Sequence, residues 1–476
     1  MHKIRWESFL KKLKSGTKLC YAIGNLGYGT ISQTLSTFIM FFGTSVLGIK
    51  GTLVGLCVAI AAFWDGLSDP IMGYISDTYC SKVFGRRLGY LLLGTIGMAI
   101  FNILLWSVPT EFGQVTKFFW LLLMLVVLET SNTLFATPYV ALGIDLAPDY
   151  NEQSSLQAYK TVFLILGMVL PSVFMMVFMP SGAQGQLSKN GYMYISYVSS
   201  ALAVVCGLVC IFGTKNAVKR LPQYKLRKKE KNAFFKIFYN FFVTLKRKNY
   251  GAIIMSYSVA LVAAAFLTSV GLHLFTYSFH FGTTQIPILM TALFVGAIAS
   301  QPVWIFISRR IDKKPALNVA YVLILVGIIL TSVVFVFREF FGTLVCFWFC
   351  VFCMLFCGFG TGALYSLPLS MFADNVTLDK LKTGENNSAT YSGYMTFAYN
   401  ISNSIALLVI GILLDIIKFD SSMPVQALKV QNGLGIIVFV GCGVSILGAM
   451  FLLSKYTLKR ADILKQQIKH RNKQKK

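Results

Sequence analysis

The sequence predicts an all-α membrane protein with twelve transmembrane helices arranged as two six-helix bundles. Hydrophobic residues make up 56% of the 476 residues and charged residues only 13%, about half the charged fraction of soluble domains. Apolar runs long enough to cross ~30 Å of hydrocarbon recur along the chain. A strongly basic segment divides these runs into two sets of six.

The twelve runs are predicted to be helices because a spanning segment has to satisfy its own backbone hydrogen bonds. The expected spans are 19–47, 52–76, 89–108, 117–142, 156–179, 192–213, 251–280, 285–308, 316–337, 342–372, 390–418 and 431–456. The chain therefore divides into an N-terminal bundle, a basic linker, a C-terminal bundle and a basic tail: 1–213, 214–250, 251–456 and 457–476.

The net charge of +25 follows membrane topology and does not indicate a nucleic-acid binder. With the N-terminus placed in the cytoplasm, the inside segments contain 36 of the 43 Lys and Arg residues. This asymmetry is the positive-inside rule. We expect a multi-pass protein of the plasma (inner) membrane, with both termini cytoplasmic and the lipid bilayer as its surroundings. No cleavable signal peptide is visible, because the apolar run after the basic N-terminus is long enough to remain as the first helix.

Neither an enzyme nor an ATP-driven pump is expected. No nucleophile–base pair and no Gly-x-x-x-x-Gly-Lys-Ser/Thr loop can be read. The ten cysteines fall mostly inside spans. Four of them share one face of the tenth span at helical spacing, where packing is favoured over a thiolate metal site: Cys346, Cys350, Cys353 and Cys357.

Two acids in the second span are the most informative feature of the chain. Asp65 and Asp69 lie four residues apart, so they face the same side of one helix. Carboxylates inside a membrane are costly and repel each other unless a cation or a proton joins them. The sequence therefore predicts a site for a positive charge here, with no metal beyond a possible Na⁺ at Asp65 and Asp69. Further ionisable groups within spans include Glu129, either a substrate or proton site or a packed polar partner, and Lys160, either a snorkelling cation or a donor aimed into the cavity. His273 and His280 lie in the seventh span, where hydrogen-bonded packing is favoured over a proton relay for His273.

Prolines and glycines near these groups predict a central cavity. Pro70 and Pro138 interrupt the second and fourth spans, and the tenth contains a Gly-rich stretch at 357–363. Such breaks are tolerated in a membrane beside protein or a water-filled cavity.

A short loop after the second span resembles a signature of the major facilitator superfamily. The run Gly73-Tyr-Ile-Ser-Asp77, followed by Gly85-Arg86-Arg87, matches Gly-x-x-x-Asp…Gly-Arg-Arg with a longer insert. A weaker echo, Ile307-Ser-Arg-Arg-Ile-Asp312-Lys-Lys314, follows the eighth span and suggests a duplicated six-helix unit. We expect Asp77, Arg86 and Arg87 to form a conformational latch of ion pairs.

Three longer segments resemble the glycoside–pentoside–hexuronide:cation symporter family of the major facilitator superfamily. They are Trp64-Asp-Gly-Leu-Ser-Asp-Pro-Ile-Met-Gly73, the run 137–160 that begins Thr-Pro-Tyr-Val-Ala-Leu-Gly, and Leu367-Pro-Leu-Ser-Met-Phe-Ala-Asp374 with Lys382-Thr-Gly384. The likeness covers essentially the whole chain. It implies the major facilitator fold and coupling to Na⁺ or H⁺, with no other cofactor.

The resemblance also implies which residues bind the two solutes. The family's cation site corresponds to Asp65, Ser68, Asp69 and Thr133. The family's helix 5 arginine corresponds to Lys160, which keeps the charge and loses the bidentate fork. The substrate-binding set that we predict is Lys160, Glu129, Asn25, Tyr139 and Asn400. Departures from the melibiose-type pattern are Ala136 for an acid, Val140 for a stacking tryptophan and Asn400 for a coupling lysine.

We therefore expect a secondary transporter that works by alternating access as a functional monomer. The leading substrate is a glycoside or similar small sugar taken up with Na⁺ or H⁺. A lysolipid or other amphipathic solute is the alternative, because sugar-type polar groups are missing. A membrane sensor or scaffold without flux is the alternative of another class.

Overall fold

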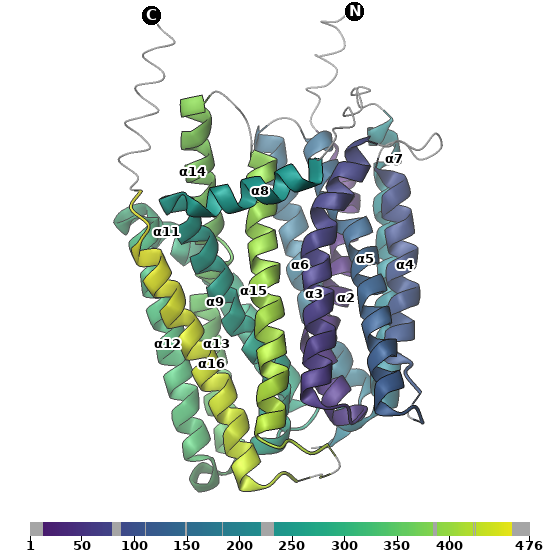
Figure 1. The fold of residues 1–476 in the computed structure, drawn as a ribbon, viewed down its shortest axis with the longest axis vertical. Helices are drawn as coiled ribbons and strands as arrows, with labels where there is room; N and C mark the ends of the chain where they lie inside the picture. Colours follow the sequence, from purple (N-terminus) through teal and green to yellow (C-terminus); the bar gives the residue numbers. More distant parts are fainter. Residues whose placement is uncertain are drawn as a thin grey trace, which may run out of the picture. The chain divides into compact units, whose positions relative to one another are not determined.

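The computed structural model is built almost entirely from α-helices (Figure 1). The structure describes residues 13–78, 87–109, 111–147, 150–182, 184–219, 233–383, 388–421, 423 and 425–458. These residues fall into two compact units. The N-terminal unit takes the described residues of 1–49, 60–181 and 185–231, and the C-terminal unit takes those of 50–59, 182–184 and 232–476.

The N-terminal unit contains most of the first six long helices. Their bounds are α2 (Ser15–Phe41), continued by the π turn η1 (Phe42–Val46), α3 (Gly51–Thr78), α4 (Leu88–Trp106), α5 (Gln114–Leu146), α6 (Tyr150–Phe178), the 3-10 turn η2 (Gly185–Leu187) and α7 (Lys189–Val218). Within this unit α2 packs against α6 and α7, and α4 packs against α5 and α7.

Buried polar contacts fix the packing of α4 on α7. The Asn102 side-chain amide donates hydrogen bonds to the Ser196 carbonyl and to the hydroxyls of Ser199 and Ser200. Its carbonyl oxygen accepts one from the Trp106 indole at 3.1 Å. Where α4 packs on α5, a Cβ at Gly94 would lie 2.6 Å from the Phe135 backbone nitrogen. Glycine is needed at that position because the two helices approach so closely.

The C-terminal unit contains the remaining helices. They are α8 (Ala233–Lys246), α9 (Lys248–His273) with the π turn η3 (Leu274–Ser278), α10 (Gln285–Ala299), α11 (Gln301–Ile311), α12 (Lys313–Val336), α13 (Arg338–Leu364), α14 (Leu367–Thr383), α15 (Ser388–Ile416) and α16 (Leu428–Ser454). The closest pairs in this unit are α9 with α16 and α15, and α13 with α10 and α12.

The helical membrane fold predicted from the sequence is confirmed. Ten helices of the described residues are long and apolar enough to cross a membrane, and the pair α10–α11 makes an eleventh, bent by 42°. The expected straight span 285–308 is therefore broken at Ser300. Pro302 lies in the first turn of α11 and has no backbone N–H to continue the hydrogen-bond ladder. The helix α2 lies where the first span was predicted. It is less apolar than the ten helices counted above, because glycine, serine and threonine make up much of it.

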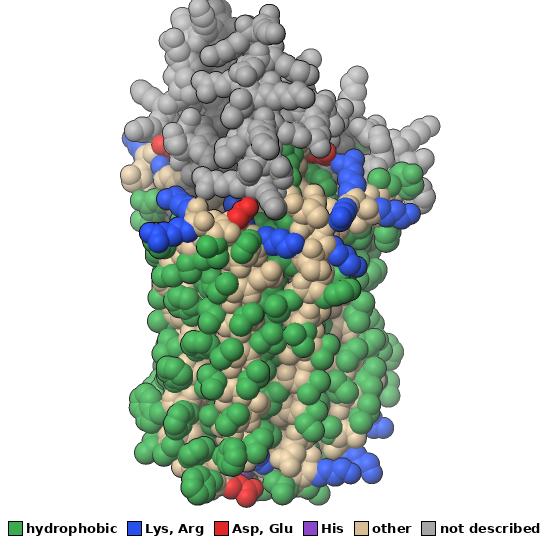
Figure 2. Space-filling view, turned by 90° about the vertical axis from the view of Figure 1, so that its left-hand side faces the viewer, with side chains coloured by type: hydrophobic (Ala, Val, Ile, Leu, Met, Phe, Trp, Pro, Cys, Tyr) green, Lys and Arg blue, Asp and Glu red, His purple; other side chains and the backbone are tan. Residues whose placement is uncertain are grey.

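Side chains that face lipid cover one side of the C-terminal unit. Figure 2 shows hydrophobic side chains over most of this face, with charged residues gathered near its two ends. Exposed apolar residues recur at helical spacing along α12 and α16: Val319, Val322, Val326, Ile329, Val333, Ile436, Val440, Val444, Leu447 and Phe451. A band of this kind is what hydrocarbon chains require.

The nine cysteines that the structure describes are unbridged thiols. Eight are buried and Cys20 is half-buried. The four on α13 are buried in the helix packing. Within the described part of the chain, no set of three or more His, Cys, Asp or Glu side chains is arranged to hold a metal ion.

Candidate cation and substrate site

Two acids of α3 are each paired with a threonine of α5. The Thr133 hydroxyl donates to Asp65 Oδ1 at 3.0 Å, and the Thr137 hydroxyl donates to Asp69 Oδ1, also at 3.0 Å. Asp65 and Asp69 lie one helical turn apart, and so do the two threonines. The result is a ladder with two rungs, in which each carboxylate meets one hydroxyl.

Ser68 joins the pair formed by Asp65 and Thr133, which is the first rung of the ladder. Its hydroxyl lies 3.0 Å from the Thr133 hydroxyl and 3.1 Å from the Asp65 carbonyl oxygen. A hydrogen bond of 2.9 Å from the Trp64 indole to the Thr130 hydroxyl holds the same two helices together. The structure thus brings together all four residues that the resemblance assigns to the cation, and their oxygens are the ligands that hard cations prefer.

Thr137 was missing from the predicted site. Its signal in the sequence is simple, because it follows Thr133 by four residues as Asp69 follows Asp65. Pro138 comes next, and a proline inside a helix removes the N–H that would bond the carbonyl oxygen four residues back. The same holds for Pro70 on α3. Each proline therefore leaves one backbone carbonyl oxygen beside the ladder without its usual hydrogen-bond donor from the helix.

Glu129 adds a third carboxyl group close to the two aspartates. It lies near enough to Asp65 and Asp69 to interact with both electrostatically. The Asn132 amide nitrogen donates to Glu129 Oε2 at 2.9 Å. Asn132 is 3% exposed, and among the described residues its buried carbonyl oxygen has no hydrogen-bond partner. A buried acceptor without a donor is costly. Nothing in the sequence pattern singled out Asn132.

Three residues of the predicted substrate set meet where α2, α5 and α6 come together. The Lys160 ammonium lies 5.5 Å from the centre of the Tyr139 ring, and the Asn25 amide nitrogen donates to the Lys160 carbonyl oxygen at 3.2 Å. The Tyr139 ring also stacks on Tyr21 with 4.4 Å between ring centres. Each of these two hydroxyls donates to the backbone carbonyl of the other residue. Asn25 and Tyr139 are thus buried and hydrogen-bonded within the unit.

The fifth predicted substrate residue lies in the other unit. Asn400 is on α15 and is 5% exposed. Its carbonyl oxygen accepts a hydrogen bond from the Ser404 hydroxyl at 2.7 Å. A role for Asn400 in substrate binding stays a prediction.

The α5 face that carries Glu129 and Thr133 turns apolar toward the C-terminal end of the helix. Val140 and Ile144 lie one turn apart on this face and are 41% and 48% exposed. With a rise of about 1.5 Å per residue, Val140 lies roughly 10 Å along the helix from Thr133. The polar stretch of α5 that carries Glu129 and Thr133 is therefore continued by an exposed apolar stretch.

The predicted latch is described only in part. Arg87 Nε lies 3.3 Å from Asp145 Oδ2, and Arg87 Nη1 donates to the Ser76 hydroxyl at 2.7 Å. These contacts connect the start of α4 with α5 and α3. The Asp77 side chain and Arg86 lie outside the described residues, so the complete latch stays a prediction.

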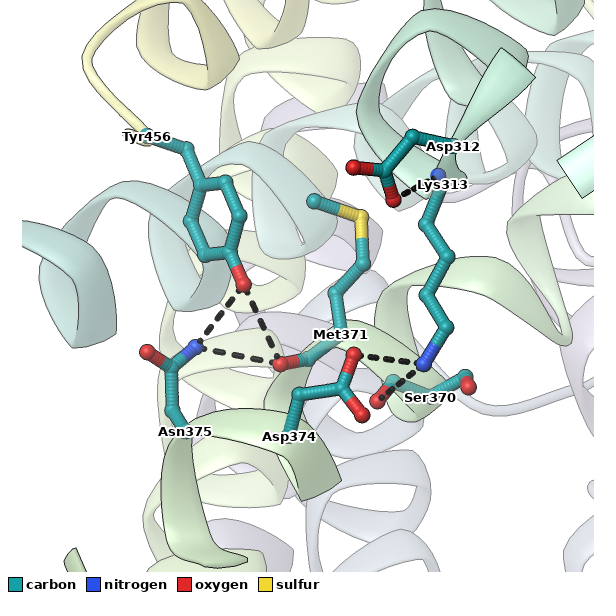
Figure 3. Close-up of polar contacts among 7 residues, drawn as sticks. All are labelled: Asp312, Lys313, Ser370, Met371, Asp374, Asn375 and Tyr456. Atoms are coloured by element: carbon teal, nitrogen blue, oxygen red, sulfur yellow. Dashed lines mark hydrogen bonds and ion pairs between the residues drawn. The ribbon is translucent and has the colours of Figure 1, made fainter. Parts of the chain in front are cut away.

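The segment 307–314 of the second half, where α11 ends and α12 begins, lies beside polar residues of α14 and beside Tyr456, which follows α16 (Figure 3). The Asp312 carboxylate caps α12 by accepting from the Lys313 backbone N–H at 2.7 Å. The Lys313 ammonium forms an ion pair with Asp374. The Tyr456 hydroxyl bonds with the Asn375 amide at 3.3 Å. Lysine and acid thus tie the start of α12 to α14 at this end of the unit.

Comparison with protein families decides what kind of protein carries this site. The family model described as "MFS/sugar transport protein" matches residues 20–460. The chain belongs to this family. The predicted likeness to the glycoside–pentoside–hexuronide:cation symporters is confirmed, and the protein is a membrane symporter and not an enzyme.

Individual relatives show how far this likeness extends. The sodium-dependent lysophosphatidylcholine symporter 1-A of Danio rerio is 23% identical over 458 residues, which are 89% of this chain and 82% of that protein. An uncharacterized symporter of Synechocystis is 32% identical over 200 residues, 40% of this chain. That alignment spans only 37% of the Synechocystis protein. The inner membrane symporter YicJ of Escherichia coli is 28% identical over 213 residues, 43% of this chain and 44% of YicJ.

Solved structures show the same fold at low identity. A bacterial homologue of the human lysosomal transporter Spinster has a TM-score of 0.62 and 12% identity, covering 97% of this chain and 98% of its own. The D-xylose-proton symporter has a TM-score of 0.59 and 13% identity, covering 93% and 99%. The major facilitator fold predicted from the sequence is thereby confirmed.

Proposed function

We propose that the protein couples the movement of Na⁺ or a proton to the transport of an amphipathic, lysolipid-type solute. The observation that carries this proposal is the face of α5. On it, oxygen ligands around Thr133 are followed by exposed Val140 and Ile144. A sugar needs acceptors for its hydroxyl hydrogens and an aromatic face to stack on, and Ala136 and Val140 offer neither.

The two ends of an amphipathic solute match the two kinds of surface in the N-terminal unit. Lys160 is half-buried beside Tyr139 and would attract a phosphate group as a point charge. The exposed apolar residues of α5 would contact an acyl chain. The relatives that align along nearly the whole chain are named as lysophosphatidylcholine symporters, which supports this class of substrate.

In the proposed cycle, the cation binds between the two rungs of the ladder. Asp65, Asp69 and Glu129 repel one another until a positive charge lies among them. Binding therefore favours the arrangement in which α3 and α5 are drawn together. If that arrangement also binds the solute better, each ligand raises the affinity for the other, since coupling free energy is reciprocal.

A sugar remains the second candidate, because the family model that matches the chain is that of sugar transport proteins. Both candidates use the same cation site and differ in what Lys160 and the apolar residues of α5 contact.

Uptake into proteoliposomes with imposed Na⁺ or H⁺ gradients tests both parts of the proposal. Labelled lysophosphatidylcholine and a panel of mono- and disaccharides would be compared in the wild type, Asp65→Asn and Asp69→Asn, with Asp420→Asn as the matched control outside the spans. We expect lysolipid uptake that follows one ion gradient in the wild type and in the control. Ion dependence that persists in both site variants would overturn the cation site, and saccharide uptake without lysolipid uptake would overturn the substrate.

A further inference from the structure

The short helix α8 lies across the end of the C-terminal unit, crosswise to the long helices α9 and α15 (Figure 1). It is anchored there by aromatic packing, because the Phe241 ring contacts Tyr394 and Phe397 of α15 with ring centres 5.7 and 4.9 Å apart. An ion pair of 2.9 Å between Arg247 and Asp379 of α14 holds the segment just after it. Its orientation on the unit is therefore fixed.

The described side chains of α8 divide into two faces. Phe241 and Thr244 are buried, at 3% and 4% exposure. Tyr239 and Phe242 are 63% and 58% exposed, and Val243 is 40% exposed. Helical spacing places these three on the same side, away from the bundle. An exposed face with two aromatic rings suits the headgroup level of a membrane, where one part of the ring meets acyl chains and another meets water.

The charge around α8 indicates which lipids it would meet. Lys246, Arg247 and Lys248 are exposed at the end of the helix. The surrounding segment 214–250 contains twelve Lys and Arg residues and a single acid, Glu230. The distribution of charge along the chain predicts that this side faces the cytoplasm. Basic residues beside an amphipathic helix attract anionic lipids.

We propose that α8 is an interfacial helix whose exposed face binds the headgroup layer of anionic phospholipids. This surface is formed by other residues than the proposed transport site and does not depend on which solute is carried. Its function would be to hold the end of the C-terminal unit at a fixed depth in an acidic leaflet, since Phe241 and Arg247 connect α8 to α15 and α14.

Site-specific photocrosslinking in the full-length protein tests this proposal. A benzophenone amino acid would replace Phe242, with Tyr239 as a second exposed position and buried Phe241 as the matched control. The protein would be placed in nanodiscs of phosphatidylcholine containing a known fraction of phosphatidylglycerol. After illumination, intact-mass spectrometry would count the lipid adducts and identify their headgroups.

We expect lipid adducts at positions 242 and 239 but not at 241, with phosphatidylglycerol enriched over its bulk fraction. The double variant Lys246→Gln/Lys248→Gln should lower this enrichment by about two- to fivefold, allowing for screening of exposed charges. The double variant Lys189→Gln/Lys429→Gln removes the same charge elsewhere and should leave it unchanged. Absence of lipid adducts at both exposed positions, or adducts in proportion to the bulk lipid, would overturn the proposal.

Discussion

Replacing Thr137 by valine should weaken cation binding while leaving the fold intact. Valine has nearly the same shape as threonine, so the change removes the hydroxyl that donates to Asp69 at 3.0 Å and leaves the helix packing almost unchanged. A hydrogen bond to a charged group contributes about 1.5–3 kcal/mol. Asp69 and Thr137 are only half-buried, so the expected loss of cation-binding free energy is smaller, about 1–2 kcal/mol.

That free energy corresponds to an increase of about five- to thirtyfold in the cation concentration that gives half-maximal uptake. The assay is solute uptake by proteoliposomes as a function of Na⁺ concentration or pH, at a fixed solute concentration. Thr137→Ser keeps the hydroxyl and should recover most of the affinity. Thr161→Val is the matched control, because Thr161 is an exposed residue of α6 whose hydroxyl donates to the Gln157 carbonyl in the same helix.

The result that would refute this reasoning is a half-maximal cation concentration for Thr137→Val within twofold of the wild type. In that case the contact between Asp69 and Thr137 would be a packing contact between α3 and α5, and the cation would be bound at Asp65 alone.

Three further predictions follow from named contacts. Lys160→Met should reduce uptake of a phosphate-bearing solute at least tenfold while leaving the half-maximal cation concentration within about twofold of the wild type. An equal loss of solute uptake and of cation affinity would place Lys160 in the cation site. Asn102→Ala should lower the free energy of unfolding by about 1–3 kcal/mol, seen as a lower midpoint in thermal melts in detergent, because it leaves the Trp106 indole without its acceptor. Gly94→Ala should lower that midpoint too, through collision with Phe135, whereas Gly113→Ala, with open space around it, should not.

The helical spans and the paired acids followed from the sequence because both rest on local rules. Hydrophobic runs of sufficient length have few other structures available in a membrane. Asp65 and Asp69 share a face at any helix orientation, since their spacing is four. The approach of α3 to α5 follows from tertiary packing, and for this reason the contact of Thr137 with Asp69 was not predicted from spacing within α3.

The helix α8 and the bend at Ser300 were not predicted, because the composition of the surrounding segments indicated other structures. The helix α8 lies within a segment whose lysines and arginines dominate its composition, so that segment was predicted as a linker. Its two-faced pattern is carried by residues such as Phe241 and Phe242, which are adjacent in sequence and differ only in the direction they face. The bend at Ser300 depends on Pro302, whose effect on a long apolar run is set by the packing of α10 and α11 on their neighbours.

The burial of the native thiols has a practical consequence for labelling experiments. Maleimides attack exposed thiolates, and the cysteines described in the structure are buried or, at Cys20, half-buried. Replacing Cys80, which lies outside the described residues, would therefore leave a background of low reactivity. A single cysteine could then be introduced at exposed Val140 and treated with an impermeant maleimide from each side of the membrane. The side from which the maleimide reacts would show toward which side the face of α5 opens.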